Sequence, residues 1–167
     1  MSLAIGIGLP YPATASAQTS KHNPSNADQA FEKLKTLVGR WEAKADKGTA
    51  VPTYQLISGG TVLLERMGMG ADHDMITAYY VDGNRLLLTH YCTTGNQPRM
   101  QAGSFDPKTN QIGFKFLDAT NLPDPNAGQM HNVVFTFVGP SEVTQNWTFY
   151  KDRKPGSTVP TDYHRVN

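Results

Sequence analysis

The stretch LVGRW, residues 37–41, marks the point where the chain changes from helical to extended spacing. Before it, apolar residues recur over residues 30–38 with the spacing of one helix face. After it, residues 40–46 alternate between charged and apolar types, which predicts a strand with one buried and one solvated face. A Gly-x-Trp at the start of a first strand, here Gly39 to Trp41, is typical of a small antiparallel barrel with an internal cavity.

The helix before this stretch has signals at both ends. Asn26 can cap it through its side-chain oxygen, with Gln29 at the reciprocal position of a capping box. Gly39 is expected to end it, because glycine tolerates the left-handed conformation common just after a helix. The sequence therefore predicts one short helix ahead of the first strand.

Strand-like segments then follow one another to the end of the chain, joined by turn-forming residues such as Gly59-Gly60 and Pro107. The expected strands are residues 40–46, 54–58, 61–67, 75–81, 86–92, 99–105, 112–117, 133–138, 143–150 and 162–166. Such a meander removes its exposed edges by closing on itself, with Arg40 and Val166 on the pair of strands that meet. The predicted fold is all-β: one up-and-down antiparallel barrel of about 8–10 strands with a short N-terminal helix.

Two segments are expected to lack regular structure. Residues 151–161 are interpreted as a loop before the last strand. The connection 118–129 contains Pro123 and Pro125, and is long enough to be either a lid over a binding site or a passive surface loop.

Composition limits the kinds of partner. The chain has 167 residues, which suits one domain, and a formal net charge of +1 with no basic run. Binding to nucleic acid or to an anionic membrane surface needs clustered Lys and Arg, so neither partner is expected. No segment is long and apolar enough to predict a span of the bilayer, and nothing in the pattern specifies an oligomeric state.

The N-terminus is interpreted as an export signal. Residues 4–13 are mostly apolar, and Ala15-Ser16-Ala17 forms a small-x-small cleavage site, although the basic residues that open such signals are missing. We therefore expect a truncated signal peptide over residues 1–17, a polar linker over 18–26 and the barrel domain over 27–167. A periplasmic or secreted protein follows from this interpretation.

Cysteine usage and motif searches assign no catalytic residue. Cys92 is the only cysteine of the sequence, so an internal disulfide cannot form. The sequence contains no Gly-x-Ser-x-Gly, P-loop, His-Glu-x-x-His or Cys-x-x-Cys motif. A binding protein is therefore favoured over an enzyme, and no cofactor is predicted.

Gly39, Arg40 and Trp41 after a short helix, followed by a strand meander, resemble the start of the calycins, the group of lipocalins, fatty-acid-binding proteins and their bacterial relatives. This resemblance implies that Trp41 lies at the closed floor of the barrel. It also implies that Arg165, near the end of the last strand, packs over the indole as a cation–π contact. Gly39, Trp41 and Arg165 are accordingly assigned to structure.

Two further resemblances bear on function. Residues 73–75, 88–92 and 95–100 are similar to a family of exported bacterial domains of unknown function, a likeness that covers most of the chain after residue 27. Gly39 to Trp41 and the chain length are also similar to haem-binding nitrobindin barrels, whose haem-ligating histidine would correspond to His164. The glycines that follow Trp in those barrels are absent here.

The interior of such a barrel is expected to bind a small apolar or amphipathic molecule. Residues on one face of their strands supply the wall, and a polar turn supplies a rim that can hold a head group. The candidate wall residues are Met75, Tyr79, His90, Phe114, Phe116, Gln145 and Trp147, and the candidate rim residues are Asn96 and Arg99.

Two alternatives remain open. One is a haem or metal protein with redox or enzymatic activity, which would use His164, His90, Cys92 or His131, with His73 as a further metal ligand. His90 and Cys92 are two residues apart and so share a strand face, but a hydrogen-bonded histidine beside a small buried thiol is the favoured interpretation. The other alternative is a structural or interaction domain whose barrel is filled by its own side chains.

Overall fold

A computed structural model describes residues 24–45, 48–68 and 74–166. The signal segment, most of the linker and His73 lie outside these residues. The described chain contains one α-helix, one 3₁₀ turn and ten strands. Their bounds are α1 (Asn26–Lys35), β1 (Gly39–Ala45), β2 (Gly48–Ile57), η1 (Ser58–Gly60), β3 (Val62–Gly68), β4 (Met75–Asp82), β5 (Arg85–Tyr91), β6 (Gln97–Ala102), β7 (Gln111–Thr120), β8 (Gln129–Gly139), β9 (Glu142–Lys151) and β10 (Lys154–Val166).

The strands form a closed, all-antiparallel, up-and-down barrel in which each strand pairs with its neighbours in sequence. The first and last strands close it, with Arg40 opposite Val166 and Trp41 opposite Arg165. Closure leaves neither β1 nor β10 as a free edge, which is the physical reason for expecting it. The predicted fold class is confirmed, including the strands that meet.

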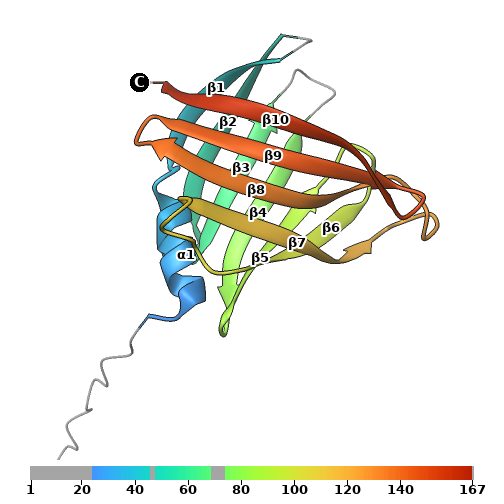
Figure 1. The fold of residues 1–167 in the computed structure, drawn as a ribbon, viewed down its shortest axis with the longest axis horizontal. Helices are drawn as coiled ribbons and strands as arrows, with labels where there is room; N and C mark the ends of the chain where they lie inside the picture. Colours follow the sequence, from blue (N-terminus) through green and yellow to red (C-terminus); the bar gives the residue numbers. More distant parts are fainter. Residues whose placement is uncertain (1–23, 46–47, 69–73, 167) are drawn as a thin grey trace, which may run out of the picture.

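Helix α1 lies against one end of the barrel, packed on β4 and β5 (Figure 1). We call this the helix end, and the opposite end, where the β9–β10 turn lies, the open end. One face of α1 is apolar, as its spacing predicted, and buries Ala27, Ala30, Phe31 and Leu34 in the barrel core. The helix thus covers one end of the barrel, so the two ends differ.

The two ends of α1 differ from the prediction. Ser25, not Asn26, is the N-cap: its hydroxyl accepts from Asp28 N at 3.1 Å, and Ser25 N donates to the Asp28 carboxylate at 2.8 Å. The helix ends at Lys35 with Thr36 as C-cap, and Gly39, at φ +128°, opens β1 instead. Ser25 and Asp28, three residues apart, make a complete capping box, which explains why the helix begins one residue earlier than expected.

Three strands begin well before their predicted first residues. β2 begins at Gly48 rather than Tyr54, although Pro52 lies within it. β8 begins at Gln129, which leaves a loop over residues 121–128. Residues 151–161, expected as a loop, mostly belong to β10, which pairs with β9 from Lys154 and shifts register between Pro155 and Thr158. A bulge allows a strand to continue through a segment rich in proline and glycine.

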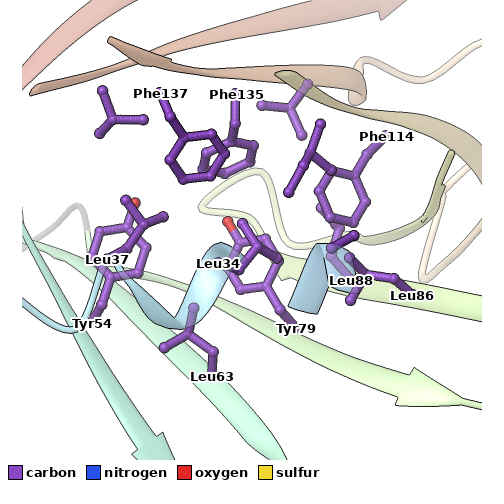
Figure 2. Packing of buried hydrophobic residues seen from close by; sticks show 14 of the residues in the cluster. Leu34, Leu37, Tyr54, Leu63, Tyr79, Leu86, Leu88, Phe114, Phe135 and Phe137 are labelled. Carbon is purple, nitrogen blue, oxygen red and sulfur yellow. The ribbon is translucent and has the colours of Figure 1, made fainter. Parts of the chain in front are cut away.

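Aromatic and aliphatic side chains fill the half of the barrel next to the helix (Figure 2). Tyr79, Phe114 and Phe135 meet edge to face, with ring centroids 5.9 to 6.1 Å apart. Leu34 and Leu37 reach them from the helix segment. This half of the barrel is a packed core, and the space that remains lies beyond it, towards the open end.

Candidate functional site

A cavity of about 190 Å³ lies inside the barrel, beyond the packed core. Seven strands contribute to its wall, and Val159, half exposed, lies at its edge. The lining residues are Ala50, Glu65, Met67, Met75, Thr77, His90, Met130, Trp147, Val159, Thr161 and Tyr163. We call this space the barrel cavity.

Much of the wall of the barrel cavity is apolar and is formed by flexible methionine side chains and a tryptophan. Met67, Met75 and Met130 come from three different strands, and Trp147 is the largest side chain among the lining residues. Methionine side chains are flexible and polarizable, and they make favourable contacts with the edges of aromatic rings. The wall therefore suits small apolar bodies of varied shape, aromatic rings among them.

A buried carboxylate, Glu65 on β3, forms part of the cavity floor. The hydroxyl of Tyr54 donates to Glu65 Oε1 at 2.8 Å, and the hydroxyl of Tyr79 donates to Oε2 at 2.5 Å. Burial raises the pKa of Glu65, and the hydrogen bonds from Tyr79, Tyr54, Gln145 and Thr77 partly offset that rise. Burial, with the nearby Glu65 charge, also raises the pKa of Tyr54 and Tyr79 well above the ordinary range, so both phenols keep their protons.

A directed chain of hydrogen bonds joins the wall to this carboxylate. The indole N–H of Trp147 donates to Gln145 Oε1 at 2.8 Å, so the Gln145 amide nitrogen is left to donate to the Tyr54 oxygen at 2.5 Å. Because an indole nitrogen is only a donor, it fixes the direction of each later bond. The Tyr54 proton must then point to Glu65, which makes the carboxylate the acceptor at the end of the chain.

His90, on β5, holds a second polar position in the wall. Its Nδ1 is 2.9 Å from Thr77 Oγ1, and its ring lies 5.0 Å from the Trp147 ring, centroid to centroid. Its Nε2 is buried and has no hydrogen-bond partner. Burial lowers the pKa of His90 to about 4, so the ring is neutral at pH 7.

The structure brings together five of the residues that the sequence placed in the wall. Met75, His90 and Trp147 line the barrel cavity. Tyr79 and Gln145 lie directly behind it, hydrogen-bonded in the Glu65 cluster. Their shared face was visible in the sequence, because residues two apart on a strand point to the same side.

Phe114 and Phe116, the two other wall candidates, do not line the cavity. Phe114 belongs to the packed core at the helix end. Phe116 stacks on His131, with ring centroids 4.5 Å apart, and His131 stacks in turn on Tyr150 at 3.8 Å. Register shifts in the β6–β7 and β8–β9 pairs lie next to Phe116 and His131, so simple alternation does not place these side chains.

The two candidate rim residues lie away from the cavity wall. Arg99 is exposed and forms a two-pronged ion pair with Asp118, with Nε to Oδ1 at 2.6 Å. Asn96 is buried and donates to the carbonyl of Gly128 at 2.9 Å, which fastens the 121–128 loop to the β5–β6 turn. Its Oδ1 is buried without a partner. Both side chains are thus engaged with the protein itself.

The candidate haem or metal ligands are dispersed. His164 is exposed on β10, opposite Glu42, while His90 lies inside the barrel and Cys92 is half-buried after β5. Across residues 24–45, 48–68 and 74–166, no three His, Cys, Asp or Glu side chains gather into a group that suits a metal ion. His73 lies outside these ranges.

The floor of the site was missed in the sequence. Glu65 alternates with Leu63 and Met67, and this spacing alone assigns it to the inner face of β3. Tyr54 and Tyr163 carry the same signal on β2 and β10, and both are buried against Glu65. The signal that could have located the polar floor was a charged residue, Glu65, at a strand position whose side chain is expected to point into the barrel.

Comparisons with known proteins add no assignment. No family model matches this chain, and the search of curated proteins found no match. Within the part of the chain that the structure describes, no helix is both long enough and apolar enough to cross a membrane.

Proposed function

We propose that this protein binds one small, mostly apolar molecule in the barrel cavity. The observation that supports the proposal is an apolar cavity of about 190 Å³ whose polar floor is already hydrogen-bonded. A floor of satisfied groups holds its shape without a ligand, and apolar walls gain by removing ligand surface from water at about 25 cal/mol per Å². Binding rather than chemistry is the role that this arrangement favours.

The volume sets the size of the ligand. An engineered cavity of about 150 Å³ in another protein holds benzene, so about 190 Å³ suits a single substituted ring or a branched chain of similar bulk. A longer molecule would have to extend past Val159 into solvent. Small probes of this size bind with dissociation constants from about millimolar to micromolar.

Methionine methyl NMR tests the proposal directly. Titration with toluene should shift the methyl signals of Met67, Met75 and Met130, which line the cavity. Met100, fully buried but not part of the lining, is the internal control and should not respond. A saturating change confined to the three lining methionines supports binding in the cavity, whereas no change up to the solubility limit of toluene would overturn it.

Export remains part of this proposal. The apolar run and the small-x-small site within residues 4–17 support the proposal of export. N-terminal sequencing of the protein recovered from the periplasm or medium of a bacterial host, expressed with basic residues added ahead of residue 4, tests export. A mature chain beginning at Gln18 is expected, and retention of the intact N-terminus inside the cell would contradict it.

A further inference from the structure

We infer that the ligand of the barrel cavity is neutral and donates a hydrogen bond, through a hydroxyl or an N–H, to Nε2 of His90, and that carboxylates are rejected. This inference rests on the proposed function and specifies the chemistry of its ligand. Three features of the cavity support it: the unpartnered Nε2 of His90, the absence of Lys and Arg among the described lining residues, and the apolar, methionine-rich wall.

The proposal assigns the proton of the neutral His90 ring to Nδ1. The Thr77 hydroxyl lies 2.9 Å from this nitrogen, and its interaction with Glu65 helps to lower the pKa of that carboxyl. When the single Thr77 hydrogen is directed to Glu65, the Thr77 oxygen accepts from Nδ1–H. A neutral imidazole then keeps its lone pair on Nε2, so this atom is an acceptor.

No described residue donates a hydrogen bond to Nε2 of His90. Nε2 is buried, lacks a partner, and belongs to a ring that borders the cavity. A buried polar atom without a partner is costly, and a ligand that satisfies it recovers part of that cost. A ligand hydroxyl or N–H supplies the missing donor.

The charges around the cavity act against anions. Among the described lining residues none is Lys or Arg, and the one charged type is Glu65. Arg99, the cation that the sequence offered for an anionic head group, is instead exposed and paired with Asp118. A carboxylate ligand would bring a second negative group to a site with a lone pair and no counter-ion, which is unfavourable on both counts.

The wall favours an aromatic body for this ligand. Three methionines and Trp147 surround the space above His90, and thioether contacts with rings are favourable. A phenol therefore combines the ring that the wall accepts with the donor that Nε2 lacks. The proposed class is a small phenol, or an N–H heterocycle of the same size.

The test compares probes of one shape by titration calorimetry at pH 7: toluene, para-cresol, para-toluate and para-methylbenzylammonium. Para-cresol should bind about tenfold more tightly than toluene, the scale of one hydrogen bond, and para-toluate should show no binding. Equal affinity of toluene and para-cresol would overturn the inference, as would binding of para-toluate. Tighter binding of the ammonium than of para-cresol would overturn it too, since Glu65 would then be the recognition group.

Variants assign the effect to His90. His90→Phe keeps a ring in place but removes Nε2, so para-cresol should lose its advantage over toluene in this variant. Thr77→Val should weaken that preference because the proton is no longer held on Nδ1, whereas Thr77→Ser should preserve it. A para-cresol preference that survives His90→Phe would contradict the assignment.

The ring nitrogens give an independent readout. In the ¹⁵N spectrum of the imidazole, His90 should show a protonated Nδ1 and an unprotonated Nε2, and para-cresol should move the Nε2 signal more than toluene does. The reverse tautomer in the free protein would overturn the inference. Failure of toluene itself to bind would instead reject the proposed function, so the two failures are distinguishable.

Discussion

Glu65 is a carboxylate buried among tyrosines, and the structure explains how a barrel interior tolerates it. Each of its two oxygens accepts from one phenol, Tyr54 or Tyr79, and the described lining of the cavity contains no Lys or Arg. Bonds from a phenol to a carboxylate are short and strong. These donors offset part of the cost of burying the group, and removing one of them should expose that cost.

Replacing Tyr79 with Phe tests this account. Tyr79→Phe deletes one of the two phenol donors and should lower the free energy of unfolding by about 1–3 kcal/mol, while raising the pKa of Glu65 further. Tyr163→Phe is the matched control, because the Tyr163 hydroxyl donates to the Met67 sulfur at 3.8 Å rather than to Glu65. It should cost less than about 1 kcal/mol. Urea unfolding of both variants gives the comparison, and equal losses would refute a special role for the Glu65 cluster.

His90 predicts how stability changes with pH. Its pKa is lowered to about 4 in the fold from an ordinary 6.5. Between these values the unfolded chain binds a proton that the folded chain does not, so stability contributed by neutral His90 is present above pH 6.5 and is lost as pH falls towards 4. From pH 7 to pH 5 this loss is about 2 kcal/mol.

The comparison with His90→Phe isolates this contribution. Glu65 acts in the opposite direction, since its raised pKa favours the protonated fold as pH falls. The wild-type curve contains both effects, but the difference between wild type and His90→Phe contains mainly that of His90. Urea unfolding at pH 7 and pH 5 should show a smaller decrease in the variant, and parallel decreases would refute the prediction.

At the scale of elements, Arg165 joins three parts of the chain at the helix end. Its guanidinium donates to the carbonyls of Thr36 at 2.6 Å, Val38 at 2.7 Å and Pro140 at 3.2 Å. It also stacks 4.3 Å from the ring of Trp41, as the resemblance to calycins implied. The end of α1, the start of β1 and the β8–β9 turn are therefore held by one side chain.

The glycine beside this junction should be hard to replace. Gly39 has φ +128°, and a Cβ there would lie 2.9 Å from Arg165 Nη1, which its bond to Val38 holds in place. Gly48 is a matched control, with φ +124° and open space around it. Gly48→Ala should cost about 1–2 kcal/mol of stability from backbone strain alone. Gly39→Ala should cost about 1–3 kcal/mol more from the close contact, and equal costs in thermal unfolding would contradict this.

The bounds of the strands show which parts of the fold the sequence alone does not predict. Strand-like runs bounded by turn-forming residues located part of every strand, because strand preference and turn chemistry are local properties of the chain. It did not reveal that β10 runs through Pro155, Gly156 and Pro160, since the pairing that keeps this segment extended comes from β9. The side chains at the register shifts of β6–β7 and β8–β9 were misplaced for the same reason: a bulge depends on the partner strand.

For the whole molecule, the barrel is packed at the helix end and hollow towards the open end. Alternation along the strands identified residues whose side chains point into the barrel. It could not show that Phe114 lies in the packed core whereas Trp147 lines the cavity. That division depends on how side chains from non-adjacent strands meet across the interior. The half of the barrel next to the helix is filled by its own side chains, and the other half contains the cavity in which we propose that a ligand binds.

A hollow end carries a cost in stability that substitution can reveal. Ala50 lines the cavity, and Ala43, directly opposite it on β1, is equally buried but does not. Ala50→Leu places new carbon atoms in existing space and should leave stability unchanged or raise it by up to about 2 kcal/mol. Ala43→Leu enters packed surroundings and should cost about 1–3 kcal/mol.

Binding should respond in the opposite order to these two substitutions. Ala50→Leu takes up part of the 190 Å³ and should weaken toluene binding at least tenfold, whereas Ala43→Leu should retain binding while it remains folded. Thermal unfolding and titration calorimetry on the same samples give both quantities. If Ala50→Leu lost stability as Ala43→Leu does and still bound toluene, the space beside Ala50 would not be where the ligand lies. The opposite changes in stability and binding are expected because the empty volume that weakens the fold is also the volume that a ligand fills.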